Sequence, residues 1–150
     1  MKSLFNKETL QEIITRINNL TPQTKPEWGK MNSAQMLAHV GQGYKTSTGE
    51  LKLKRTFIGV LFGGMAKKSA IGSEKPFSKG LPTDKSFIIS DPVEFEDEKK
   101  KLIERIEKFS TGGANGITKE THPFFGELTP EEWDILMYKH TDHHLRQFGV

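Results

Sequence analysis

Four stretches of this chain repeat apolar residues at helical spacing, and this pattern constrains the fold more than any other feature. In the first stretch, Ile13, Ile14 and Ile17 lie on one stripe with Leu10 and Leu20. No segment alternates apolar and polar residues as a half-buried strand would. The sequence therefore predicts an all-α fold, a four-helix bundle. The stripes lie within residues 7–20, 32–44, 91–109 and 129–148.

Three of the four predicted helices begin at a sequence signal for a helix N-terminus. Asn32 is followed three residues later by Gln35, as in a capping box, and the same spacing begins at Asp91 and at Thr129. A proline follows both Asp91 and Thr129, which suits the first turn of a helix. We expect the stripes to meet in one core, formed by Leu10, Ile14, Ile17, Met36, Leu37, Val40, Leu102, Ile103, Ile106, Trp133, Met137 and Phe148.

The chain between the second and third long helices is less regular. Residues 57–65 predict a short buried helix that is broken where Gly63 meets Gly64. Residues 72–91 are rich in glycine and proline and predict a long irregular connection. Its apolar residues predict packing onto the body of a single domain that spans residues 1–150. These residues are Phe77, Leu81, Phe87, Ile88 and Ile89.

Composition narrows the functional classes. The formal net charge of +3 comes from Lys and Arg residues interleaved with Asp and Glu, which argues against nucleic-acid binding. Without Cys, disulfides, thiolate metal sites and cysteine nucleophiles are excluded. Residues 1–6 lack the apolar core of a signal peptide, and the longest apolar stretch is far shorter than a bilayer span. We therefore expect a cytoplasmic protein without a membrane partner.

Two histidines in the last predicted helix are the strongest candidates for function. His140 and His144 are four residues apart, so they lie one turn apart on the stripe that carries Trp133, Met137 and Phe148. Imidazole is the commonest protein metal ligand, and two at this spacing can share one ion. The alternative is a pair of buried histidines satisfied by polar neighbours. Spacing alone leaves both interpretations open.

The other polar candidates have weaker patterns. Thr141 stands where the glutamate of an HExxH motif would be, so a zinc protease of that type is not supported. His143 is expected on the flank of the helix, and Asp142 is expected to be exposed. His122, before Pro123, is expected to have a structural role. No nucleophile elbow or dinucleotide-binding glycine pattern is present.

The two ends of the chain carry motifs that resemble a known superfamily. The chain resembles the C-terminal signature of the DinB/YfiT-like superfamily at His122–Trp133 and at Lys139–Gly149. It also resembles a second-helix signature at Trp28–Val40. Within the superfamily, the chain looks most similar to a bacterial family of unknown function. Leu81–Asp84 and Asp91–Pro92 fit its middle section, so the resemblance covers nearly the whole chain.

The resemblance implies a DinB-like four-helix bundle with a divalent metal held by three histidines. Carried onto this sequence, the ligands are His39, His140 and His144. The resemblance supplies His39, which periodicity places on the shoulder of its stripe. Three imidazoles suit Zn or Ni, and also Cu or Fe. Members of the superfamily include thiol-dependent transferases and proposed metal-dependent hydrolases.

Two classes of function follow from these expectations. The first is an enzyme in which the ion acts as a Lewis acid on water or on a low-molecular-weight thiol. No catalytic acid or base is identified, and His143, Gln147 and His122 are the nearest candidates for an outer-shell role. The second is a non-catalytic binding or structural module, in which a fourth protein ligand would close the metal site. A small-molecule substrate or thiol and a second copy of the chain, as a homodimer, are the expected partners.

Overall fold

The computed structural model describes all 150 residues and is entirely helical, as the sequence predicts. It contains no strand beyond one isolated bridge between His122 and Gly126. No helix is both long and apolar enough to cross a bilayer. The five α-helices are α1 (Lys7–Asn18), α2 (Ser33–Ser47), α3 (Phe57–Ile71), α4 (Phe95–Gly112) and α5 (Pro130–Gln147), and two 3-10 turns occupy Lys85–Phe87 and Gly113–Gly116.

Two of the three predicted start signals are confirmed. Asn32 and Thr129 both form complete capping boxes, at the N-termini of α2 and α5. The start predicted at Asp91 is wrong, because α4 begins at Phe95 and has no side-chain cap. Phe95 is the first residue of that segment to be buried. The next three residues are all acidic, so they stabilise the first turn through the helix dipole without a cap.

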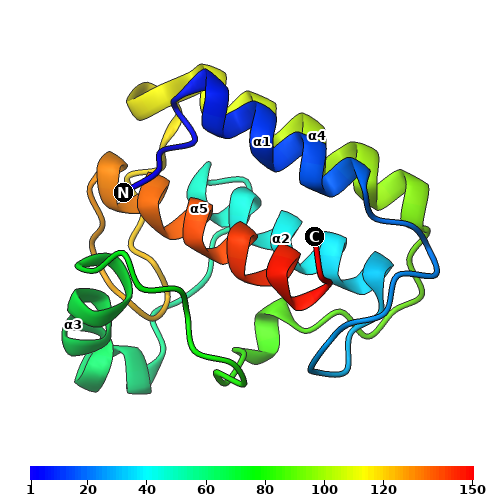
Figure 1. Ribbon diagram of the computed structural model, residues 1–150. Helices are drawn as coiled ribbons and strands as arrows, with labels where there is room; N and C mark the ends of the chain where they lie inside the picture. Colours follow the sequence, from blue (N-terminus) through cyan, green and yellow to red (C-terminus); the bar gives the residue numbers. More distant parts are fainter.

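The core lies between four of the helices. α1 runs beside α4, and α2 lies beside α5 in the neighbouring layer (Figure 1). α2 packs against both α4 and α5, so it is central. Most of the predicted core residues are buried, but Leu10, Ile14 and Ile103 are only partly buried. On α1 the fully buried side chains of the stripe are those of Ile13 and Ile17, because the stripe is wider than the surface that α4 and α5 cover.

The helix α3 differs from its prediction in length and in burial. It continues without a break to Ile71, and six of its large apolar side chains are exposed. The reason is that α3 docks through glycines. A Cβ at position 59 would lie 2.7 Å from the carbonyl oxygen of Phe124, and a Cβ at Gly63 would overlap the same carbonyl. The small residues therefore make the contact, and the large ones face solvent.

The connection from residue 72 to residue 94 is irregular apart from one 3-10 turn, as predicted. Its predicted packing is only partly confirmed. Phe77 packs against the core, whereas Leu81 and Ile88 are 55% and 58% exposed. The connection crosses α2, where the amide of Gln35 donates to the carbonyl of Ile89 at 3.4 Å. This path brings the turn at Phe87 next to the buried side of α2.

Candidate metal centre

Three histidines from two helices meet between α2 and α5. His39 lies on α2, and His140 and His144 lie one turn apart on α5. One ring nitrogen of each lies within 4.8 Å of the other two. The ring centroids are 4.6–5.0 Å apart, and the rings are inclined to one another by 68–85°. The structure thus brings together the three residues that the resemblance singled out, and the cluster could hold one metal ion.

The main chain fixes the tautomer of His39. Its Nδ1 lies 2.9 Å from the carbonyl oxygen of Phe87, in the 3-10 turn of the connection. A carbonyl oxygen only accepts, so Nδ1 of His39 carries the proton and donates it. The neutral ring then keeps its lone pair on Nε2. This Nε2 faces the cluster, 3.1 Å from Nε2 of His140.

A side-chain amide fixes the tautomer of His144. Nε2 of Gln147 donates to the carbonyl oxygen of Trp28 at 2.7 Å, so the amide oxygen of Gln147 points the other way. That oxygen lies 2.8 Å from Nδ1 of His144, which must therefore be the protonated nitrogen. Metal-binding histidines usually donate their second ring N–H to such a partner, because it orients the ring and fixes the tautomer.

Of these hydrogen-bond partners, the sequence predicts only one. Gln147 is among the outer-shell candidates, and the structure places it in contact with His144. The carbonyl groups of Phe87 and Trp28 have no counterpart in the prediction, because a main-chain acceptor leaves no signature in the residue type. Only the path of the connection across α2 shows that Phe87 reaches His39.

Close packing positions the ring of His140. A Cβ at Gly43 of α2 would lie 3.3 Å from Nδ1 of His140 and 2.9 Å from the methyl carbon of Met137. Glycine therefore lets the two helices approach each other at the cluster. His39 and His144 are buried, whereas His140 is only partly buried.

Burial lowers the pKa of all three imidazoles, because the charged ring would be poorly solvated. This cause dominates for His39, whose pKa lies below its ordinary value. Burial and the nearby ring of His39 lower the pKa of His144 to about 3. Burial, and then the neighbouring histidines, bring the pKa of His140 well below 6.5. All three rings are therefore neutral at pH 7, which is the state that a metal requires.

We expect the metal-free protein to lose stability as the pH falls below about 6.5. The unfolded chain takes up protons at the ordinary histidine pKa of 6.5, whereas the folded pKa values are about 3 for His144 and about 4 for His122. Between these values the unfolded state binds more protons, so its free energy falls relative to the folded state. For these two residues the free energy of unfolding should fall by about 3 kcal/mol between pH 6.5 and pH 5. Urea denaturation of chelator-treated protein measures it, and an unchanged value would contradict the burial of these rings.

The donor set fits a divalent metal with an open coordination position. The group contains three imidazoles and no carboxylate or fourth histidine. Structural zinc sites are usually closed by four protein ligands, whereas catalytic sites keep three and leave one position free. Imidazole nitrogen suits zinc, copper, iron and nickel.

Replacing Gln147 by leucine should weaken zinc binding by about 10–100-fold. The substitution removes the acceptor for Nδ1 of His144 while keeping a side chain of similar size. Gln42→Leu is a matched control on α2, because the Gln42 side chain forms no hydrogen bond with the cluster. Calorimetric titration of metal-stripped protein measures both. Equal affinity in Gln147→Leu and wild type would show that this amide does not orient a ligand.

His143 and His122 occupy different surroundings. His143 lies on the flank of α5, as predicted, with its ring between Trp28 and Phe77 and 5.0 Å from the ring of His144. It therefore borders the cluster without joining it. Nδ1 of His122 accepts hydrogen bonds of 3.0 Å from the main-chain N–H groups of the second and third residues after it. His122 thus shapes the loop before α5, in agreement with the structural role expected.

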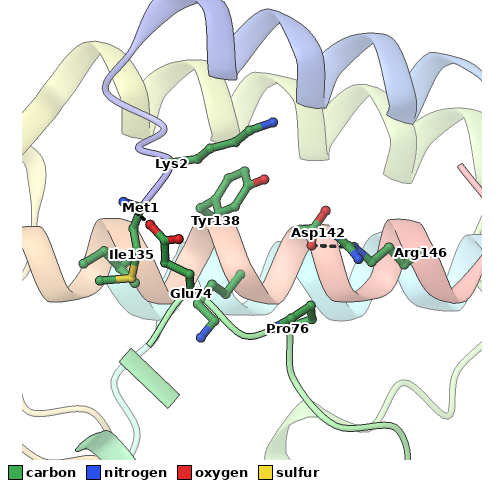
Figure 2. Close-up of a pocket in the computed structure, with 9 residues that line it drawn as sticks. Met1, Lys2, Glu74, Pro76, Ile135, Tyr138, Asp142 and Arg146 are labelled. Atoms are coloured by element: carbon green, nitrogen blue, oxygen red, sulfur yellow. Dashed lines mark hydrogen bonds and ion pairs between the residues drawn. The ribbon is translucent and has the colours of Figure 1, made fainter. Parts of the chain in front are cut away.

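The prediction that Asp142 is exposed is wrong. Its carboxylate is buried and forms 2.8 Å ion pairs with Arg16 of α1 and Arg146 of α5. The two guanidinium groups offset the cost of burying this charge. Asp142 lines a surface hollow of about 370 Å³ together with Tyr138 and Glu74, and no histidine is among the residues that line it (Figure 2). It does not reach the three-histidine cluster.

One family of known proteins matches the chain. The family described as "Protein of unknown function (DUF1569)" matches residues 2–149. No curated protein and no solved structure matches. The matched range contains both helices of the cluster and the connection that supplies the partner of His39.

Proposed function

The chain belongs to the DUF1569 family, whose members share a description as proteins of unknown function, and we propose that it is a divalent-metal-binding protein with a catalytic three-histidine centre. One observation carries the proposal. Hydrogen bonds from Nδ1 of His39 and His144 to Phe87 and Gln147 place the proton of each ring on Nδ1, so that each Nε2 carries a lone pair that a metal ion in the cluster could accept. Hydrogen bonds of this kind, from the second ring nitrogen to a carbonyl or amide oxygen, are those that orient histidine ligands in metal sites.

We also infer that α1, α2, α4 and α5 form a DinB-like four-helix bundle. The contacts of α2 with α4 and α5, and of α1 with the same two helices, support this arrangement. The two segments that resemble the superfamily signatures contribute the three histidines, His39 from the first and the HxxxH pair from the second. A ligand set that spans two facing helices is typical of metal sites in bundle cores.

Zinc or nickel is the ion that we expect, and a bound divalent ion would supply Lewis-acid polarisation to a substrate group at its open position. The residues of the chain provide the remainder of the site. Phe87 and Gln147 hold two of the imidazoles in the required tautomer. Trp28, His143 and Phe77 form an aromatic border beside the cluster, and Nζ of Lys79 lies 4.2 Å from the ring centroid of Trp28. This border suits an uncharged or anionic small molecule.

We propose metal-dependent hydrolysis or transfer of a low-molecular-weight thiol as the reaction. The chain has no cysteine, so a reacting thiol would come from a second substrate. The absence of a fourth side-chain ligand in the cluster favours catalysis over a purely structural ion. The alternative of a non-catalytic module predicts bound metal without turnover.

The test begins with elemental analysis of protein purified without a metal-affinity tag. Metal-stripped and metal-loaded protein are then assayed for ester hydrolysis and for thiol transfer to an electrophile. We expect one reaction to require added metal, and to be lost in His144→Ala but retained in Leu81→Ala, which changes an exposed residue. Tight metal binding without either reaction would favour the non-catalytic module.

A further inference from the structure

The helix α3 presents a large apolar surface to solvent. It lies at one edge of the molecule, apart from α1 and α4 (Figure 1). Its exposed fractions range from 54% for Phe62 to 78% for Phe57. No charged residue interrupts positions 56–66. We refer to this surface as the α3 face, which consists of Phe57, Ile58, Val60, Leu61, Phe62 and Met65.

The area of the α3 face exceeds what a monomer usually exposes. With roughly 200 Å² for each fully exposed large side chain, the six residues expose about 780 Å² in total. The largest apolar patch on a typical monomer is about 300–600 Å². A stable protein interface needs about 800 Å² from each partner. The α3 face is therefore close to one half of an interface of ordinary size, and it is rich in the Phe and Met side chains that interface cores favour.

Gly64 lies within the α3 face, and no contact inside the chain requires a glycine there. Gly59 and Gly63 are buried against the loop at Phe124, where a Cβ would not fit. Gly64 points away from that loop, and a Cβ there would meet no atom within 4 Å. Glycine in the middle of an exposed helix lowers helix stability relative to alanine. A notch of this kind is useful when a second helix approaches the backbone closely.

From these observations we propose that the α3 face is the interface of a homodimer, in which α3 packs against α3 of a second copy across a two-fold axis. Such an interface uses the same surface on both subunits, so one apolar face covers the other and closes the assembly. Gly64 of each copy would lie near the crossing point of the two helices. About 1,550 Å² in total would be buried, which is within the range of specific complexes.

Lysines near α3 should make the dimer and membrane binding respond to salt in opposite directions. Lys54 lies before α3 and Lys68 lies near its end, and neither forms an ion pair within the chain. Whether two α3 helices run parallel or antiparallel, these cations face cations. Added salt screens this repulsion, so it should tighten a dimer. Salt would weaken binding of the same cations to anionic lipid.

Sedimentation equilibrium of the full chain at about 100 µM, in low and high salt, tests the proposal. We expect a dimer in the wild type that tightens with salt. Leu61→Glu should weaken it by at least ~100-fold, because a charge would be buried without a partner. Leu81→Glu is the matched control, since Leu81 is about as exposed but lies in the connection. Equal dimerisation of the two variants, or a monomeric wild type, would overturn the proposal.

Gly64→Ala separates the interface from the stability of α3. In a chain that stays monomeric, alanine should raise the thermal stability and change nothing else. In the proposed dimer it fills the notch, so dissociation should become easier while the circular dichroism of the helices is kept. Flotation with phosphatidylserine vesicles is the companion measurement. Binding of monomers to these vesicles that weakens with salt, without dimers in solution, would assign the α3 face to lipid and would contradict the proposal.

Discussion

Replacing His140 with alanine is expected to weaken zinc binding by at least ~100-fold. The substitution removes one of three converging ligands, and loss of an outer-shell partner alone typically costs 10–100-fold in metal affinity. His140 is the partly buried member of the cluster, so alanine there leaves a cavity that water can fill. Calorimetric titration of metal-stripped protein gives the affinity, and circular dichroism of the same sample verifies the fold.

The matched control for this substitution is His143→Ala. His143 is the next histidine in the sequence of α5, and its ring borders the cluster without contributing to it. We expect its replacement to change zinc affinity only a few-fold, because the packing of Trp28 and Phe77 is altered but no ligand is removed. If His143→Ala weakened binding as much as His140→Ala, the metal would have to lie elsewhere on α5.

Leu37→Ala is expected to lower the stability of the fold strongly. Leu37 of α2 is fully buried in the core. Removing its side chain should lower the free energy of unfolding by about 2–5 kcal/mol and the melting temperature by roughly 5–15 °C. Leu81→Ala makes the same chemical change at a side chain that is 55% exposed, and it should shift stability by less than about 0.5 kcal/mol. Thermal denaturation of both variants in metal-free buffer measures the difference, and similar shifts would contradict the burial of α2.

The helices were predictable where local chemistry decides them. The spacing of apolar residues and the capping boxes at Asn32 and Thr129 act within a few residues, so the sequence is sufficient to place α2 and α5. The side of α3 that is buried depends on a distant loop instead. Its glycines fit the main chain near Phe124, and a count of apolar residues points to the opposite face. Predictions from periodicity fail there because small residues carry the contact.

The candidate metal centre was likewise predictable only where local spacing decides it. Helical spacing is sufficient to put His140 and His144 on one face, but His39 entered only through the resemblance, because its position on the stripe is ambiguous. The burial of Asp142 depends on Arg16, which is 126 residues away in the sequence. The carbonyl of Phe87 depends on the path of an irregular connection. Long-range partners of this kind follow from the packing of the whole chain, and no local pattern reports them.

The central claim is that His39, His140 and His144 together hold one divalent ion with an open position. X-ray absorption spectroscopy at the zinc edge, on protein loaded with one equivalent of zinc, tests it most directly. The account predicts three imidazole nitrogens at about 2.0–2.1 Å and one further light atom from solvent. A spectrum with fewer than three imidazoles, or with zinc coordinated mainly by carboxylate and water, would contradict it.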